Sequence, residues 1–504
     1  MADPTRVNVG SVIVPAEGIT TAERYLAKLC KRSFLSMWSY PGVFRDQGRH
    51  AHKGDGKEVC DLLVVFENHV LIFSDKDCEL FGGEHIQQNW ARWFRKAVQN
   101  SAKQVWGAER WIKTFPNRLF LDRQCKIPFP LNLPEPSNAT FHRIVVAHGA
   151  SRACREHLGG SGSFMLYNRL IGDAHLNESF TIGQLDPDKG YVHVFDDTTL
   201  TILLETLDTI TDFTAYLTKE ERFLTGRRVV FAAGEEELLA VYLRGLNEAG
   251  EHDFIIEENL DGVAFEEGFW DAFVVSPERS AQIDADKISY FWDELIEKFS
   301  FHAMTGTQYL TSGQPLRDQE IMFRFLAREP RTRRRMLSKR FRDAIQKSTQ
   351  LEKNCYVSVV EPSRTGDPFY VFLFLRRRPE FSEESNRNVR GNLLMNYCRV
   401  VKVIYPQAIH IIGIATEAGF PSIRSEDFVY LNASEWTPED EAEAREIQRQ
   451  FRLLQNITRH EGREREYPVS PVQRPRKKPL SRNAPCPCNS GKRYKRCCGK
   501  EIFG

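Results

Sequence analysis

The sequence predicts an α/β protein built from several domains. Its 504 residues leave room for about three domains of ordinary size. Short runs rich in valine, isoleucine, leucine and phenylalanine predict buried strands, and longer segments with apolar residues three or four positions apart predict amphipathic helices. A hydrophobic content of 41% and a charged content of 27% are typical of a water-soluble globular chain.

The compartment is predicted from the apolar segments and the cysteines. No run of about 18 apolar residues is free of charge, so we expect no membrane-spanning helix. The N-terminal segment lacks the basic start and long apolar core of a secretory signal. Seven of the eleven cysteines are scattered along the chain, as free thiols are in a reducing compartment. We therefore expect a cytoplasmic protein.

Residues 56–76 predict a buried β-hairpin with charged ends. Residues 59–66 and 70–73 are apolar runs separated by a short polar break. Polar and charged residues lie at the ends of these runs: Glu58, Asp61, Ser74, Asp75 and Lys76. A buried carboxylate beside a lysine is unfavourable unless it is paired, so we expect a metal ion or the opposite charge to pair with these groups.

The hairpin resembles the core of the PD-(D/E)xK nuclease superfamily, in which an Asp begins one strand and an acid-x-Lys pair follows on the next. Asp61 matches the family's metal-binding Asp. Lys76 matches its lysine, which shares a face with the residue two positions earlier. That earlier residue is Ser74 instead of an acid, so one metal ligand is missing. The resemblance covers residues 1–130 and implies a restriction-endonuclease-like α/β/α domain there.

The replacement for the missing ligand stays open. Either Glu58 or a bulged Asp75 takes its place, or the site is weakened or inactive. The family often supplies a Glu from its first helix, and Glu23 is placed for that role, although a capping box at residues 20–23 also explains this Glu. Gln104 is placed to approach the site, as polar residues of the same helix do in the family.

The resemblance implies metal-dependent hydrolysis of phosphodiester bonds in DNA or RNA. Asp61, with Glu58 or Glu23, would hold Mg²⁺ or Mn²⁺, which polarises the phosphate and supplies a hydroxide. Lys76 would orient that water or stabilise the charge that develops on phosphorus. Ser74 would contribute only a hydroxyl or a water-mediated contact.

Beyond the hairpin, the chain predicts two further α/β units. A helix at residues 90–113 has a basic face that is either solvated or offered to a phosphate backbone. A proline-rich break near residues 128–136 is expected to close the first domain. Residues 131–350 predict an α/β middle region with its own core, and residues 351–460 predict a third α/β unit. A basic, flexible linker is expected at residues 461–483.

The elements of these units follow from the same patterns. Strands are predicted at residues 142–148, 190–195, 228–232, 355–360, 369–375 and 408–415, and helices at residues 198–217, 235–243, 382–401 and 437–457.

His142, His148 and His193 are interpreted as core or edge histidines, because no metal-ligand spacing connects them. The arginine-rich run at residues 324–342 predicts either a solvated helix or a surface for a polyanion or an acidic partner. No nucleotide-binding P-loop is present, so we do not expect an ATPase.

The last residues predict a small zinc site. Cys486 and Cys488 form one pair and Cys497 and Cys498 another, and four thiolates in so short a segment can enclose one tetrahedral Zn²⁺. Residues 484–504 closely resemble the SEC-C motif, the zinc-binding C-terminus of the preprotein translocase ATPase. The resemblance implies a docking element without an open ligand position, and its basic residues suit an acidic protein or a nucleic acid as partner.

Two functions of different classes remain. The first is a bacterial nuclease with a zinc adaptor, an architecture that resembles components of restriction or anti-phage defence. The second is a non-catalytic scaffold, in which the hairpin retains only the fold while the basic run and the zinc tail recruit nucleic acid or protein. Ser74 favours the scaffold. A third function, as an accessory protein in translocation or for a chaperone, is suggested by the tail alone.

Overall fold

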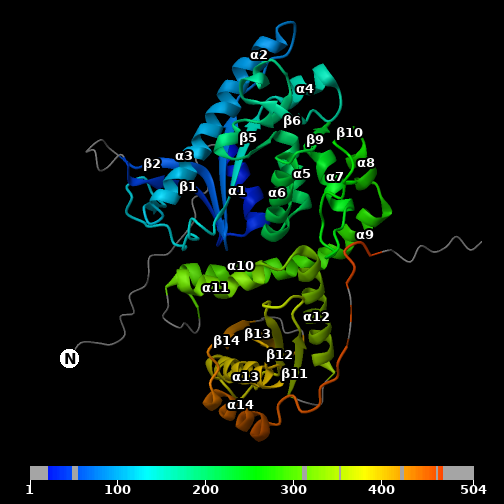
Figure 1. Cartoon of the computed structure of the whole chain (residues 1–504). Coiled ribbons are helices and arrows are strands. Elements are labelled where there is room, and N and C mark those ends of the chain that lie inside the picture. Colours follow the sequence, from blue (N-terminus) through cyan, green and yellow to red (C-terminus); the bar gives the residue numbers. More distant parts are fainter. Residues whose placement is uncertain are drawn as a thin grey trace, which may run out of the picture.

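The computed structural model describes residues 21–47, 55–308, 315–350, 354–419, 425–460, 462 and 464–468. Over these residues the predicted α/β class is confirmed, because helices pack on three β-sheets (Figure 1). The helices in this part of the chain all lack the combination of length and apolar character that crossing a bilayer requires.

The first sheet contains the predicted hairpin. Its strands are β1 (Ser39–Arg45), β2 (Lys57–Phe66), β3 (His69–Asp77), β4 (Leu119–Phe120), β5 (Thr140–His148) and β8 (Val192–Phe195). They lie in the order β4-β1-β2-β3-β5-β8. β1, β2 and β3 are antiparallel neighbours, whereas β5 is parallel to β3 and β8 is parallel to β5. β2 and β3 are thus the hairpin expected at residues 56–76.

Helices cover both faces of this sheet. They are α1 (Thr21–Phe34), α2 (Ile86–Phe94) and α3 (Asn100–Thr114), with a π-helical turn, η2 (Arg95–Gln99), that joins α2 to α3. α1 packs on one face, where the rings of Phe34 and Phe73 lie 6.2 Å apart. α3 packs on the other face, where Gln104 contacts Ser74. The helix predicted at residues 90–113 is confirmed, with the π-helical turn as an unpredicted feature.

The sheet extends beyond the boundary expected near residue 130. The proline-rich segment at residues 128–136 leads into β5, which pairs with β3 from His69 opposite Thr140 to Asp77 opposite His148. Prolines end regular structure locally, but they carry no information about the sheet that the next strand joins. β5 joins in parallel because α2 and α3 provide the long crossover that parallel neighbours need. Residue 130 therefore lies inside this unit and not at its end.

The middle region adds a second sheet, with the order β10-β9-β6-β7. Its strands are β6 (Met165–Ile171), β7 (Thr181–Gln184), β9 (Val229–Ala232) and β10 (Gly262–Phe265). The helices of this region are α4 (Ser151–Leu158), α5 (Asp197–Thr206), α6 (Ile210–Leu224), α7 (Glu235–Arg244), α8 (Phe269–Val274) and α9 (Pro277–Asp286), and short 3₁₀ turns are η3 (Gly172–Leu176), η4 (Pro187–Lys189) and η5 (Lys287–Ser289). The single helix predicted at residues 198–217 is two helices, because the Thr209 hydroxyl begins α6 by accepting the backbone N–H of Asp212 at 3.1 Å.

The middle region does not have the separate core that was expected. One apolar cluster runs from the first sheet through the middle region to the third sheet, and it includes Phe34, Phe213, Trp292 and Phe372. The rings of Phe34 and Phe213, which come from α1 and α6, lie 5.2 Å apart. Local patterns predict which residues are buried, but they do not reveal which units share a core.

The C-terminal unit is a third sheet with the order β11-β12-β13-β14. Its strands are β11 (Cys355–Val360), β12 (Phe369–Leu375), β13 (His410–Glu417) and β14 (Glu426–Asn432), and its helices are α13 (Glu383–Ile404) and α14 (Pro438–Phe451). α10 (Tyr290–Thr305), α11 (Leu316–Ala327) and α12 (Arg331–Thr349) precede it. Figure 1 shows α10 and α11 between this unit and the rest of the molecule. β14 was not predicted, because none of its side chains is fully buried and its apolar pattern is weak.

The arginine-rich run at residues 324–342 is an internal junction, and neither a solvated helix nor an open basic surface. Arg334 and Arg335 of α12 are completely buried, and Arg331 is 9% exposed. Each of these guanidinium groups pairs with a carboxylate: Arg331 with Asp208 at 2.7 Å, Arg334 with Asp293 at 2.6 Å and Arg335 with Asp286 at 3.0 Å. The prediction of an exposed helix or surface rested on the excess of arginines in this run. It was wrong because the aspartates that pair with these arginines lie elsewhere in the sequence.

The start of the expected flexible linker also contacts this junction. Glu464 forms ion pairs with Arg335 and Lys339 of α12. Glu466 pairs with His252, whose Nε2 lies 2.9 Å from its carboxylate. Residues 464–468 are therefore fixed against the body of the protein.

Candidate functional site

The predicted catalytic residues converge where the β2–β3 hairpin ends. Asp61 of β2 is half-buried, and its Oδ2 accepts the backbone N–H of Asp75 at 2.6 Å. This contact places the Asp61 carboxylate against β3 between Ser74 and Lys76. Lys76 is exposed at the end of the strand. The structure thus brings Asp61 to the strand segment that carries the matching lysine.

Ser74 occupies the position of the missing acid and faces α3. Its side chain is buried, and its Oγ donates a hydrogen bond to Oε1 of Gln104 at 3.1 Å. Gln104 therefore approaches this position as expected. Because residues two apart on a strand share a face, Lys76 lies on the same side of β3 as Ser74.

Asp75 does not replace the missing ligand. A bulge at Asp75, which was one of the alternatives, is absent from the β3–β5 pairing, which keeps one register from His69 to Asp77. Asp75 therefore lies on the opposite face from Ser74, with Phe73 and α1. Its carboxylate is nearly inaccessible and lies 2.9 Å from Nε2 of His148. Regular strand alternation explains why the acid next to Lys76 is turned away from it.

Glu58, by contrast, shares a face with Asp61. The register between β1 and β2 shifts, so that Val43 lies opposite Cys60 but Phe44 lies opposite Glu58. Val43 and Phe44 are consecutive, so they lie on opposite faces of the sheet, and each shares a face with the residue opposite it. Glu58 and Cys60 therefore lie on opposite faces. A bulge in β2 thus brings Glu58 to the face of Asp61. Bulges often re-aim side chains next to functional sites.

Glu23 remains outside this group of located side chains. Its backbone belongs to α1, which covers the face opposite Asp61, but its side chain lies outside the described residues. Its predicted metal-binding role stays a prediction.

On the face of α1, His148 bridges two carboxylates that the sequence did not connect. Its Nε2 lies 2.9 Å from Oδ1 of Asp75, an ion-pair contact without linear hydrogen-bond geometry, and its Nδ1 lies 2.6 Å from Oδ1 of Asp197 at the start of α5. Burial alone would lower the pKa of His148, but the contacts with Asp197 and Asp75 raise this pKa to about 10. His148, which was expected to be a core or edge histidine, is the last residue of β5. The carboxyl ends of parallel strands meet at one edge of a sheet. Because His148 ends β5 and Asp197 follows the parallel strand β8, this rule could have predicted from the sequence that the two residues lie close together.

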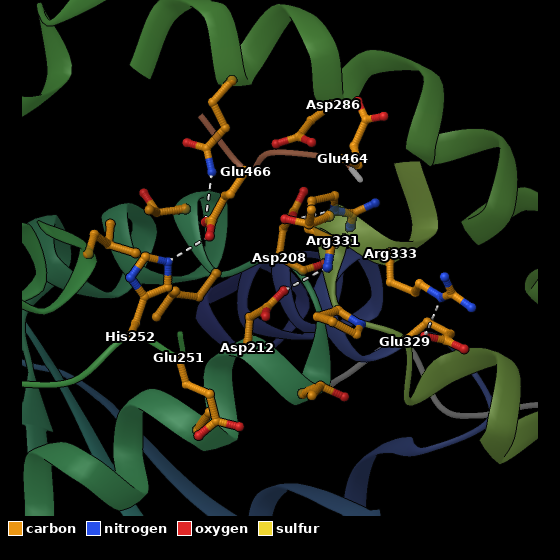
Figure 2. Close-up of a pocket in the computed structure, with 18 of the residues that line it drawn as sticks. Asp208, Asp212, Glu251, His252, Asp286, Glu329, Arg331, Arg333, Glu464 and Glu466 are labelled. Atoms are coloured by element: carbon orange, nitrogen blue, oxygen red, sulfur yellow. Dashed lines mark hydrogen bonds and ion pairs between the residues drawn. The ribbon is translucent and has the colours of Figure 1, made fainter. Parts of the chain in front are cut away.

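A large cavity of about 1330 Å³ lies at the junction of α6, α9, α12 and residues 464–467. Figure 2 shows charged side chains from these segments around it. Many of the charges pair with one another: Arg331 with Asp208 at 2.7 Å, His252 with Glu466 at 2.9 Å and Arg333 with Glu329 at 3.8 Å. Because these charged groups form ion pairs with one another, we interpret the cavity as part of a structural junction and not as a ligand-binding site. Apart from the arginine-rich run at residues 324–342, no pattern in the sequence indicated this cavity.

The predicted zinc ligands Cys486, Cys488, Cys497 and Cys498 lie outside the described residues. The SEC-C motif model matches residues 482–500. The chain is similar to protein translocase subunit SecA of Trichlorobacter lovleyi, at 39% identity over 61 residues that make up 12% of this chain and 6% of that protein. It is also similar to protein translocase subunit SecA of Thermodesulfovibrio yellowstonii, at 63% identity over 30 residues, or 6% of this chain and 3% of that protein.

These likenesses cover a short segment only. The chain spans well under a tenth of the length of either relative. No solved structure matches the chain. The rest of the molecule is therefore interpreted from its own residues.

Proposed function

We propose that this chain is a metal-dependent nuclease whose site lies at the end of the β2–β3 hairpin. The observation that supports this most directly is the contact of Asp61 with the backbone of Asp75, with Glu58 on the same face of the sheet. The order of elements agrees with the proposal: a helix, three antiparallel strands, a crossover helix and a parallel strand, with helices on both faces, as a restriction-endonuclease-like α/β/α domain requires.

The side chains at the hairpin fit a hard divalent cation. Mg²⁺ and Mn²⁺ prefer oxygen ligands, and Mg²⁺ is commonly held by one or two carboxylates together with water and substrate phosphate. Asp61 and Glu58 would be those carboxylates. When bound, such an ion polarises the phosphate and favours ionisation of a water. Lys76 would add a positive charge beside the phosphate, and the Ser74–Gln104 hydrogen bond would hold the strand end in place.

Cleavage of mixed DNA and RNA substrates with Mg²⁺ or Mn²⁺ tests this proposal. Asp61→Ala and Lys76→Ala are each expected to lower the cleavage rate by at least about 100-fold, because they remove a metal ligand and a charge that acts on the phosphate. Asp77→Ala and Lys347→Ala change exposed groups of the same types and should leave the rate unchanged. Cleavage that survives both site changes would rule out the hairpin as the active site.

The alternative, a non-catalytic scaffold, is favoured by one observation. The residue at the position of the second acid is a buried serine bonded to Gln104, and the neighbouring Asp75 faces the other side of the sheet. A scaffold would bind nucleic acid or protein equally well after Lys76→Ala and would lose that binding when residues 484–504 are deleted. Binding measured by fluorescence anisotropy for both variants separates the two functions.

We further propose that the tail is a zinc-binding docking element in a cytoplasmic protein. The SEC-C match supports the zinc site, and the seven cysteines in the described part of the chain are free thiols, as expected in a reducing compartment. Replacing Cys486 and Cys497 by serine is expected to release zinc from the tail while the circular dichroism of the whole chain stays unchanged. Zinc content by mass spectrometry, with Cys125→Ser as the control, measures this. Zinc content that does not fall would contradict the tail site, because the second site proposed below would contribute equally to the variant and to the control.

A further inference from the structure

Three histidines lie in a row across neighbouring strands of the first sheet. His69 begins β3, His142 lies in β5 and His193 lies in β8. The imidazoles of His142 and His193 are buried, at 0% and 1% exposure. Nε2 of His142 lies 2.9 Å from Nδ1 of His69, and Nδ1 of His193 lies 2.9 Å from a carboxylate oxygen of Glu220 in α6. Each buried imidazole therefore has one nitrogen with a partner.

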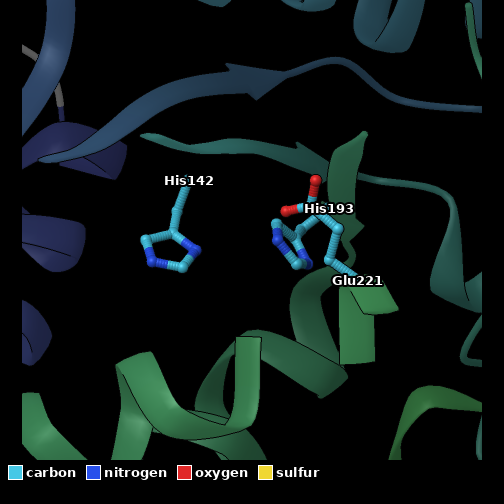
Figure 3. Close-up of side chains that lie close together, drawn as sticks. All are labelled: His142, His193 and Glu221. Atoms are coloured by element: carbon cyan, nitrogen blue, oxygen red, sulfur yellow. The ribbon is translucent and has the colours of Figure 1, made fainter. Parts of the chain in front are cut away.

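The second nitrogen of each buried imidazole has no hydrogen-bond partner among the described residues. These atoms are Nδ1 of His142 and Nε2 of His193. Buried polar atoms almost always have a partner, so two such atoms from adjacent strands require an explanation. One ligand atom each from His142, His193 and the half-buried Glu221 lie within 4.8 Å of one another. Figure 3 shows these three side chains.

We propose that His142, His193 and Glu221 bind a divalent transition-metal ion of the Zn²⁺ type. Two imidazoles and a carboxylate are ligands that such ions take, and three protein ligands leave a fourth position for water or another ligand. Ligand atoms lie about 2.0–2.2 Å from Zn²⁺, so two of them in a tetrahedral site are about 3.3–3.6 Å apart. The three ligand atoms lie within 4.8 Å of one another, so side-chain rotations need to bring them closer by at most about 1.5 Å.

His69 and Glu220 are placed to orient the two ligands. A metal-binding histidine usually donates its other ring N–H to an acceptor, which fixes the tautomer and the ring plane. If His193 donates its Nδ1–H to Glu220, its Nε2 lone pair faces the ion. If His142 donates its Nε2–H to His69, its Nδ1 lone pair does the same. A cation at this position also favours the ionised form of Glu220, which is the better acceptor.

The protonation of the ligands agrees with this arrangement. Burial lowers the pKa of His193 to about 4. Burial, with smaller contributions from His193 and His69, holds the pKa of His142 well below its ordinary value. Both imidazoles are therefore neutral near pH 7, and the neutral form is the one that binds metal.

This site is independent of the proposed nuclease site. His69 and Lys76 stand at opposite ends of β3, about 20 Å apart along the strand, and the histidine row lies on the face of α1 and α6. The ion would join β5, β8 and α6. It would therefore stabilise the shared core whether or not the hairpin cleaves nucleic acid.

The test uses the full chain with the four tail cysteines replaced by serine, so that the tail no longer binds zinc. We expect this variant to retain about one Zn²⁺ per chain by mass spectrometry. Bound Co²⁺ should give the absorption of a nitrogen- and oxygen-ligated ion without the sulfur-to-cobalt charge-transfer band of a thiolate site. Zinc should also raise the melting temperature of this variant.

Substitutions then locate the ion. In the same background, Glu221→Gln and His142→Gln should each weaken Zn²⁺ binding at least 100-fold, and His69→Gln should weaken it about 10–100-fold as an orienting residue. His85→Gln changes an exposed histidine and should have no effect. If His142→Gln fails to fold, Glu221→Gln still tests the proposal, because Glu221 is only half-buried and its substitution should leave the protein folded. The proposal is overturned if the chain without the four tail cysteines binds no zinc, which would leave a bridging water as the partner, or if Glu221→Gln binds zinc as tightly as its parent.

Discussion

Replacing Arg331 by alanine is expected to destabilise the protein by about 3–5 kcal/mol. Its Nε lies 2.7 Å from Oδ1 of Asp208, its Nη1 lies 2.8 Å from Oδ2 of Asp293, and its Nη2 donates to the backbone carbonyl of Asp208 at 2.8 Å. Burial would lower the pKa of Arg331, but Asp208 and Asp293 raise it well above its ordinary value. Alanine would leave the buried Asp208 without its ion-pair partner, which is the main part of the cost, whereas Asp293 would keep its pair with Arg334.

Urea unfolding followed by tryptophan fluorescence measures this effect as a lower midpoint. Arg342→Ala is the matched control, because Arg342 lies exposed on the same helix and should change the free energy of unfolding by less than about 0.5 kcal/mol. The double variant Arg331→Met with Asp208→Asn should lose less stability than the sum of its single changes, because the unpaired charge is removed with its partner. Equal midpoints for Arg331→Ala and Arg342→Ala would show that the junction contributes nothing to stability.

The sequence predicted most elements whose apolar pattern is strong. β11 and β12 were expected at the residues where they occur, and the β2–β3 hairpin follows from two apolar runs around a polar break. The helix at residues 90–113 was expected from apolar side chains at helical spacing, and those side chains are buried. In each of these cases a few neighbouring residues carry the whole signal.

The sequence could not predict features that depend on distant partners. The three buried arginines of α12 resemble a solvated charge run until Asp208, Asp286 and Asp293 are placed beside them. His142 and His193 were interpreted as core histidines, and they are buried as expected. Their approach to Glu221 depends on β5 and β8 being neighbours. Such pairings follow from the topology of the sheet and not from local spacing.

The candidate hairpin site was predictable only in the part that depends on neighbouring residues of one strand. Asp61, Ser74 and Lys76 were placed by strand alternation, and regular pairing of β3 puts Asp75 on the other face. The position of Glu58 depends on a bulge in the pairing of β2 with β1, and no residue of β2 indicates that bulge in the sequence. The alternation of side chains along a strand therefore predicts which residues share a face only where the strand has no bulge.

His148→Gln is expected to remove the loss of stability that the wild type shows as the pH rises from about 6.5 to about 10. The pKa of His148 is about 10 in the folded protein and about 6.5 in an unfolded chain. Because the folded pKa is the higher one, the stabilisation is fully present below about pH 6.5 and is lost as the pH rises toward 10. At full strength it amounts to at most about 5 kcal/mol, from a difference of about 3.5 pKa units. Burial alone would raise the pKa of Asp197, but the hydrogen bonds that its carboxylate accepts from His148 and from the backbone N–H of Gly149 lower this pKa. At the acid end the stabilisation is therefore lost as the pH falls below about 4.

Unfolding midpoints in urea at several pH values between 6 and 10 measure this effect as the difference between wild type and His148→Gln. The difference should be largest near pH 6 and should shrink steadily toward pH 10, because deprotonation removes the same charge that the substitution removes. His157→Gln changes an exposed histidine and should parallel the wild type throughout. A difference between wild type and His148→Gln that does not vary with pH would mean that His148 acts through packing alone and is not the cation that joins β3, β5 and α5.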